Sequence, residues 1–560
     1  MSSTNFIISN PSEYTKNSPD RHVLLHLRIS LSKSALYGDL GKKSSLSTPT
    51  LNLIRLLSVS VPIVNTNSLP LKPSSVSTVN ASKSLNASFD LINLLMNSCV
   101  ISNFDAGVGG VDCRGNDLII EGEIPQDLYG SFYRNGPDPQ FSPLGKYHWF
   151  GGDGMVHAFH FENGRVSYLN RWSKTSKWKQ ERKAGRSLKD GMNPMNADPL
   201  WNPEDEDGVA NTNIIFHAGK LLALEEGHLP FELDPITLES KGAYDYEGKL
   251  KSPMTAHPKI DPVTGDMYGF SYTADNLFSS KMSYFVIDSK GELKTYEEFE
   301  APFASMVHDF MVTDQHIIFP IFPLTIDFER VTTGKPPIAW DPDKGTHVGV
   351  MPRNGSVKDI LWFDNDARYV FHPMNAYTKG GKIYADVMQF EEAPLFPHAD
   401  GTRGDPKNAE ARLNRWEIDL ESNSKSFKSD YLDEDMGEFP RLDERYSMLE
   451  YQHGYYASGI GEHPNGYSFN SVVHRDHVKN SKEVYTLGKH DCLGEPVFVP
   501  KKENSEEGDG YLLTIVHRGI ENRSDLLILD ANNVSDGPIA TAKLPHRIPH
   551  GFHGNWRAGN

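Results

Sequence analysis

The sequence predicts an all-β fold, and among all-β folds it favours a β-propeller. From Gly107 onward, short apolar and aromatic runs are broken by Gly, Pro, Asp and Asn about every eight to twelve residues, a pattern typical of many short strands. A weak repeat ends such runs in aspartate, and Asp234, Asp261 and Asp288 are evenly spaced along the chain. The alternating long helices of an α/β fold are missing. Repeated antiparallel hairpins over about 450 residues favour radial repetition, which leaves few exposed sheet edges.

The same aspartates predict where the turns lie. An Asp side chain caps its own turn, and a following Gly tolerates positive φ, so residues 261–266, 288–292 and 163–164 are expected to be hairpin turns. Helical pieces are few. Residues 172–189 and 408–415, where charged residues are interspersed, are predicted to be helical insertions above the sheets.

Residues 1–105 are predicted to be an extension outside the fold, and residues 106–560 to be the propeller domain. The extension is rich in Ser and Asn, poor in acids, and without sustained periodicity. Two interpretations are open: a disordered tail, or an organelle transit peptide. The first is compatible with a cytoplasmic protein, and the second with an organelle such as a plastid.

Composition narrows the possible partners. The net charge is −18, and residues 101–560 hold 47 basic and 70 acidic side chains, a balance that argues against nucleic-acid binding. Three cysteines are too few for a disulfide framework and suit a reducing compartment. The longest apolar stretch, residues 51–64, is shorter than the roughly 20 residues needed to cross a bilayer. Peripheral contact with a membrane surface is still compatible with an apolar ligand.

Four of the 22 histidines stand where a strand-like run meets a turn. They are His257 in TAHPKID, His308 in SMVHDFM, His372 in YVFHPMNA and His553 in HGFHGNW. If a blade takes roughly 66 residues, the three gaps between successive histidines are about one, one and three blades long, although six or eight blades fit nearly as well as seven. We therefore expect the four side chains to face a shared central axis.

Four neutral imidazoles indicate a divalent transition metal. Fe(II), Zn(II) and Cu(II) accept such ligands, whereas Mg(II) and Ca(II) prefer carboxylates. Ligating histidines usually donate their second ring N–H to a carboxylate. Glu226, Glu438 and Glu495 are the candidates, because the last two lie near proline in apolar surroundings where an unpaired charge is costly. The alternative is that all three are surface-loop acids.

Together these motifs resemble the carotenoid cleavage oxygenase family over residues 110–557. The shared motifs, in order, are GSFYRNGPDPQF (130–141), FGGDGMVHAF (150–159), ANTN (210–213), the four histidine contexts, GEFPR, GEPVFVP and GFHGNW. The resemblance implies a seven-bladed propeller with a helical cap over an axial metal site. It also implies Fe(II) as the only cofactor, held by His257, His308, His372 and His553.

The resemblance further implies that Glu226, Glu438 and Glu495 bind His308, His372 and His553 respectively. The implied reaction is cleavage of a conjugated C=C bond by O2 into two carbonyl products, with an apolar small molecule as substrate. Two other classes of protein are alternatives to an oxygenase: a non-catalytic binding scaffold and a zinc hydrolase. A non-catalytic propeller scaffold has no use for the histidine pattern, and a zinc hydrolase usually keeps fewer protein ligands.

The substrate expectation depends on three positions. Residues 172–213 and the run HAGKLLALEEGHLPFELDP (217–235) resemble the lignostilbene and isoeugenol branch, which anchors a phenolic hydroxyl with a Tyr and a Lys. Here Glu225 stands at the Lys position, Met192 is nearest to the Tyr, and only the aromatic Phe150 is kept as a predicted substrate contact. A carboxylate cannot stabilise a phenolate, and Met donates no hydrogen bond. The sequence therefore favours a carotenoid or apocarotenoid, with a stilbene or phenylpropenoid as the alternative.

Overall fold

The computed structural model describes residues 118–144, 147–189, 196–272, 274–460 and 469–559. Contacts divide the chain into residues 1–83 and 84–560, and the first unit lies outside the described residues. The predicted extension, residues 1–105, also falls outside them. The following account concerns the described part of the second unit.

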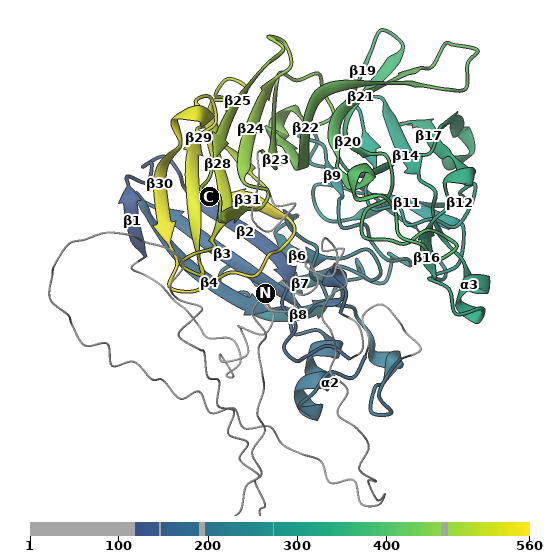
Figure 1. The fold of residues 1–560 in the computed structure, drawn as a ribbon, viewed down its shortest axis with the longest axis horizontal. Helices are drawn as coiled ribbons and strands as arrows, with labels where there is room; N and C mark the ends of the chain where they lie inside the picture. The colour runs from purple at the N-terminus through teal and green to yellow at the C-terminus, as the bar shows by residue number, and fades with distance from the viewer. Residues whose placement is uncertain (1–117, 145–146, 190–195, 273, 461–468, 560) are drawn as a thin grey trace, which may run out of the picture. The chain divides into compact units, whose positions relative to one another are not determined.

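Small antiparallel sheets make up this unit, and they form the seven blades of a β-propeller (Figure 1). Each of the first four blades is a four-stranded sheet. Blade 1 contains β31 (Gly554–Ala558), β2 (Gly130–Pro137), β3 (Gly154–Glu162) and β4 (Arg165–Trp172); blade 2 contains β5 (Asn213–His217), β6 (Lys220–Leu224), β7 (Phe231–Leu233) and β8 (Ser240–Ala243); blade 3 contains β9 (Lys259–Ile260), β10 (Met267–Ser271), β11 (Lys281–Ile287) and β12 (Leu293–Glu300); blade 4 contains β13 (Met311–Val312), β14 (His316–Ile321), β17 (Thr346–Pro352) and β18 (Leu361–Asn365).

The remaining three blades share strands or carry extra ones. A seven-stranded sheet holds blades 5 and 6, because the long strand β22 ends one blade and begins the next. Blade 5 contains β19 (Tyr369–Lys379), β20 (Lys382–Phe390), β21 (Arg412–Asp419) and β22 (Lys428–Leu442); blade 6 adds β23 (His453–Ser458), β24 (Ser471–Asp476) and β25 (Ser481–Thr486); blade 7 contains β26 (Asp491–Leu493), β27 (Val497–Pro500), β28 (Gly510–Arg518), β29 (Arg523–Asp530), β30 (Pro538–Lys543) and β1 (Ile119–Gly122). The strands β15 (Leu324–Ile326) and β16 (Ile338–Trp340) form a separate pair.

The predicted turns are confirmed, and their chemistry is the expected one. Residues 261–266 join β9 to β10, residues 288–292 join β11 to β12, and residues 163–164 join β3 to β4. The side chain of Asp261 accepts hydrogen bonds from the backbone N–H groups two and three residues later, at 2.7 and 3.1 Å. Gly265 has the positive φ that the turn requires, 73°.

Of the two helical insertions predicted, one is correct. The helix α2 (Ser176–Ala184) lies within residues 172–189 and begins at the capping residue Thr175. Residues 408–415 are wrong as a helix: η6 (Pro406–Ala409) is a short 3-10 turn, and β21 follows at Arg412. Trp416 and Ile418 are buried in alternation with half-buried neighbours, so the strand pairs on both edges despite its charged residues.

The other helical elements are short. They are η2 (Trp149–Gly151), η3 (Pro203–Asp205), α3 (Phe328–Thr332), η4 (Pro342–Lys344), η5 (Val357–Asp359), η7 (Glu444–Tyr446) and η8 (Val534–Asp536). Among the residues described, none of the helices is both long enough and apolar enough to span a bilayer.

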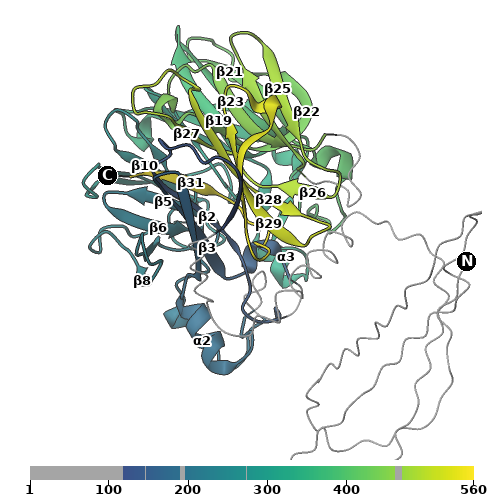
Figure 2. The same cartoon turned by 90° about the vertical axis from the view of Figure 1, so that its left-hand side faces the viewer.

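Strands from opposite ends of the sequence close the ring of blades. In blade 1, β31 pairs with β2, with Arg134 opposite Gly554, and β31 also contacts β5 of blade 2 (Figure 2). In blade 7, β1 pairs with β30. Two backbone hydrogen bonds to Asn135 fix the loop before β31. The N–H of Phe552 donates to the carbonyl of Asn135 at 3.0 Å, and the N–H of Asn135 donates to the carbonyl of His553 at 2.9 Å. The position of His553 therefore depends on ring closure.

Candidate metal centre and substrate cavity

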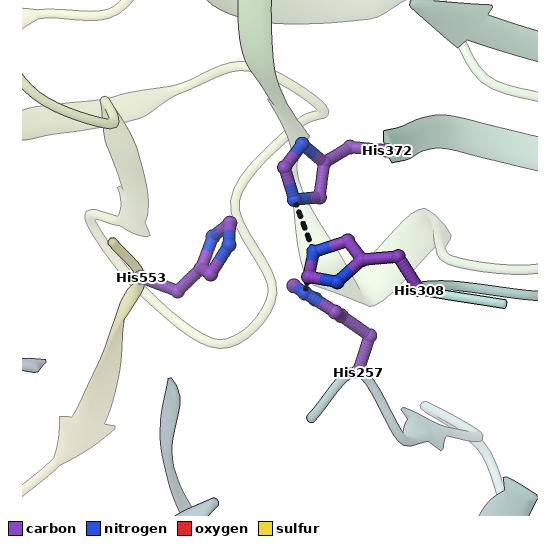
Figure 3. A group of neighbouring side chains, drawn as sticks. All are labelled: His257, His308, His372 and His553. Atoms are coloured by element: carbon purple, nitrogen blue, oxygen red, sulfur yellow. Dashed lines mark hydrogen bonds between the residues drawn. The ribbon is translucent and has the colours of Figure 1, made fainter. Parts of the chain in front are cut away.

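The structure brings the four predicted histidines together (Figure 3). His257 lies just before β9 in blade 3, His308 just before β13 in blade 4, and His372 within β19 in blade 5. His553 lies immediately before β31 in blade 1 and approaches from the opposite side of the group. These positions are one, one and three blades apart, as the spacing predicts.

Each of the four rings turns a nitrogen toward the others. All four candidate ligand atoms lie within 4.8 Å of one another. The Nε2 of His308 is 3.0 Å from the Nε2 of His257 and 3.0 Å from that of His372. All four side chains are buried. Burial, reinforced by the neighbouring histidines, holds the pKa of His257 and of His372 well below the usual value, which favours the neutral form that binds a metal.

Three glutamates fix the orientation of three of the rings. Glu226, which follows β6 in blade 2, binds the Nδ1 of His308. Glu438 on β22 accepts from His372 Nδ1 at 2.6 Å, and Glu495, just before β27, accepts from His553 Nδ1 at 2.9 Å.

These are the pairs that the family resemblance implies, and their presence leaves Nε2 as the atom facing the axis. Because Glu226, Glu438 and Glu495 come from blades 2, 6 and 7, each of the seven blades contributes one group to the centre.

The residues present fit a divalent metal ion. Two ligands at right angles with bonds of about 2.1 Å lie roughly 3 Å apart, which matches the Nε2 separations. The charges also fit. Among the described residues, one oxygen of Glu438 is buried without a hydrogen-bond partner, and the cation Arg441 pairs with Glu495 at 3.1 Å rather than with Glu438. A buried carboxylate of this kind needs a nearby positive charge, and a metal ion at the four imidazoles would supply it.

His257 differs from the other three histidines. Its Nδ1 is 3.8 Å from Asp309 Oδ2, too far for a direct hydrogen bond. Both oxygens of Asp309 instead accept from Lys259 Nζ, at 2.8 and 3.0 Å. The sequence analysis missed Asp309 although it directly follows His308. It also missed Tyr272, whose hydroxyl donates to Glu226 at 2.5 Å.

A cavity of about 570 Å³ reaches His308, His372 and His553 from one side. Aromatic side chains form much of its wall: Trp149, Phe150, Phe371, Phe396, Phe439 and Phe552. The predicted substrate contact Phe150 lies in η2, with its ring centroid 5.6 Å from that of Phe552 and 6.5 Å from that of Phe371. A flat, conjugated molecule would find stacking surfaces here, next to the four histidines.

Glu225 also borders this cavity, but its negative charge is compensated. Its carboxylate accepts hydrogen bonds from the backbone N–H groups of Val209 at 2.8 Å and Ala210 at 3.2 Å, and it binds the Nδ1 of His228. His228 lines the cavity and its side chain is 31% exposed. The position of Met192 lies outside the described residues. Glu225 is thus a positioning group for His228, and its carboxylate is not an uncompensated charge facing the cavity.

Comparison with known proteins agrees with these features. The family model for retinal pigment epithelial membrane protein matches residues 112–558. Isoeugenol monooxygenase of Pseudomonas putida is 41% identical over 79% of this chain and 95% of its own. Lignostilbene-alpha,beta-dioxygenase isozyme III of Sphingomonas paucimobilis is 40% identical over 79% of this chain and 93% of its own.

More distant and structural relatives complete the comparison. Carotenoid 9,10(9',10')-cleavage dioxygenase 1 of Arabidopsis thaliana is 31% identical over 78% of this chain and 86% of its own. The crystal structure of Pseudomonas brassicacearum lignostilbene dioxygenase superposes with a TM-score of 0.77, at 38% identity, over 80% of this chain and 96% of that one. Each of these relatives is named as an oxygenase.

Proposed function

Because this chain belongs to the carotenoid cleavage oxygenase family and is an oxygenase, we propose that it uses Fe(II) and O2 to cleave the conjugated C=C bond of a phenylpropenoid or stilbene. The products are two carbonyl compounds. The observation that carries the proposal is the buried group of four histidines beside an aromatic cavity. Of the metals that four imidazoles accept, iron and copper can supply the redox chemistry that O2 requires, and the family resemblance favours iron.

The residues of the chain contribute binding, orientation and exclusion of water. The aromatic wall holds the flat substrate so that its double bond lies beside the four histidines, and this positioning is a major source of rate. Glu226, Glu438 and Glu495 keep three imidazoles in a fixed tautomer and direction. The apolar cavity also keeps reactive species away from water.

The aryl-alkene substrate has more support than the polyene expected from the sequence. The relatives named for isoeugenol and lignostilbene are 41% and 40% identical, against 31% for the Arabidopsis carotenoid enzyme. The polyene expectation depended on Glu225 and Met192. Met192 lies outside the described residues, and the Glu225 carboxylate is satisfied by two backbone N–H groups and His228. His228 gives the aromatic cavity a polar side chain that can bind a phenolic hydroxyl.

A substrate panel tests this proposal. Protein loaded with Fe(II) would be incubated under labelled O2 with isoeugenol, resveratrol, β-carotene and an apocarotenal, and the products identified by mass. We expect labelled aldehydes from the first two and little product from the others. Cleavage of the polyenes alone would overturn the substrate assignment, and products without label would overturn the oxygenase chemistry.

The role of His228 can be tested with matched substrates. His228→Ala should lower kcat/KM for isoeugenol by roughly tenfold, the cost of one lost hydrogen bond to a buried group, and leave the O-methylated analogue unchanged. Equal losses on both substrates would mean that His228 only supports the cavity wall.

A further inference from the structure

A second cavity, of about 420 Å³, reaches the histidines from the other side. Its wall includes His257, His372 and His553, whereas the aromatic cavity includes His308, His372 and His553. His372 and His553 thus border both cavities, while His257 faces only the second and His308 only the first. The four imidazoles therefore separate two spaces with different walls.

Charged side chains line both cavities, but the second wall has three aromatic residues where the first has nine. Three cations and three anions line the second cavity: Lys259, Arg441, Arg445, Asp309, Glu444 and Glu495. They form ion pairs, such as Lys259 with Asp309 at 2.8 Å and Arg441 with Glu495 at 3.1 Å. The cavity extends to the surface beside η7, because Glu444 lines it and has a side chain that is 56% exposed.

The two walls suit different ligands: an apolar substrate in the first cavity and a metal ion in the second. A hydrated divalent cation loses much of its solvation in an apolar cavity, and that loss is costly. The ion pairs in the second wall, and ordered waters in a cavity of this size, can keep the ion solvated. When substrate is bound, moreover, it fills the aromatic cavity. The second cavity is the route on which a metal ion has the smaller desolvation cost.

His257 is the ligand placed to admit the ion. The other three histidines are each held at Nδ1 by a glutamate, so turning any of them breaks a charge-assisted hydrogen bond. His257 has no direct carboxylate partner, because Lys259 holds Asp309 3.8 Å away. It can turn toward the second cavity without that loss.

We propose that the second cavity is the entry and exit route for the metal ion, and that His257 is the ligand that moves to let it pass. This inference depends on the metal-binding part of the proposed function but not on the identity of the substrate. It assigns the two cavities separate tasks: substrate on the His308 side and metal exchange on the His257 side.

The route can be blocked at Ser447, which lines the second cavity next to η7 and has a half-buried side chain. In Ser447→Trp the indole would fill the opening, and Ser447→Ala is the matched control. The metal-free proteins would be mixed with Co(II) without O2, and binding followed by the visible absorbance of the bound ion. We expect the Trp variant to bind and release Co(II) about tenfold more slowly, with unchanged affinity, because a filled cavity leaves no passage.

A second measurement needs no variant. Wild-type protein is saturated, without O2, with the alkene that the substrate panel identifies, and Co(II) binding is timed again. We expect an unchanged rate. A rate that falls sharply when substrate fills the aromatic cavity would overturn the proposal. Binding of Co(II) by the Ser447→Trp variant at the wild-type rate would overturn it as well.

Fully iron-loaded enzyme provides the last comparison. Ser447→Trp should keep the wild-type kcat and KM for O2. A raised KM for O2 with normal Co(II) loading would identify the cavity as an oxygen route instead. Failure of the wild-type protein to bind any divalent metal stoichiometrically would reject the proposed function itself, which is a distinct outcome.

Discussion

His553 and His257 are neighbours in the candidate metal centre, with ring centroids 4.4 Å apart, yet the protein holds them in very different ways. The backbone of His553 is hydrogen-bonded to Asn135 and Thr212, which belong to the first two blades and are far from it in the sequence. Its ring is hydrogen-bonded to Glu495. His257 is fixed by a short local bond from its N–H to Thr255 Oγ1, 3.0 Å, and its ring has no direct carboxylate partner. One ligand is thus coupled to the strand that closes the whole ring, whereas the other is held by contacts within its own and the adjacent blades.

Truncation should separate the two ligands most strongly. A chain ending before Gly551 loses β31 and His553 together, so we expect loss of cooperative unfolding as well as of metal binding, measured by calorimetry and metal analysis. An equivalent deletion does not exist for His257, whose loop lies inside the chain. A truncated protein that still melts cooperatively would show that ring closure does not depend on β31.

Single substitutions should remove the metal without removing the fold. His553→Ala and His257→Ala each delete one of four ligands, and we expect both to abolish stoichiometric iron binding and turnover while circular dichroism stays unchanged. If His553→Ala retained full activity, its assignment as a ligand would be wrong.

The carboxylate partners should show a graded difference. Glu495→Gln should weaken iron affinity or turnover by about 10- to 100-fold with the fold intact, as changes to a ligand's hydrogen-bond partner typically do. Iron titration and steady-state kinetics measure both effects. An unaltered enzyme would mean that the bond from His553 Nδ1 to Glu495 contributes little.

Asp309→Asn should give the smallest effect. Because Asp309 makes no direct bond to His257, we expect the iron affinity, measured by the same titration, to fall less than about fivefold, well below the effect at Glu495. A loss equal to that of Glu495→Gln would indicate that Asp309 holds His257 as firmly as the glutamates hold the other rings, and would remove the contrast between the two ligands.

The blade repeat explains why so much of the centre could be predicted. In a propeller, distance along the sequence becomes angle around the axis, so the unequal spacings of the four histidines place them in blades 3, 4, 5 and 1. The hairpins were equally predictable, because Asp261 and its equivalents carry their own turn signal. The family and its fold followed from the motifs.

Contacts between neighbouring loops could not be predicted. Glu225 stood out as a reversed charge, but the sequence did not show that two backbone N–H groups and His228 would satisfy it. Asp309 lies beside a histidine from the preceding blade, a relation that depends on how blades pack. Residues 408–415 were mistaken for a helix because charges near the start of β21 hid its alternation.

Closure by β31 also affects how the protein matures during synthesis. A ribosome makes His257, His308 and His372 long before His553, and the strand that completes blade 1 is made after all the other blades. A nascent chain therefore holds three of the four histidines in an open ring. Pairing between β2 and β31, which lie at the two ends of the domain sequence, is slow to form, so metal loading is expected after release from the ribosome rather than during translation. Unfinished chains would carry no active oxidising centre.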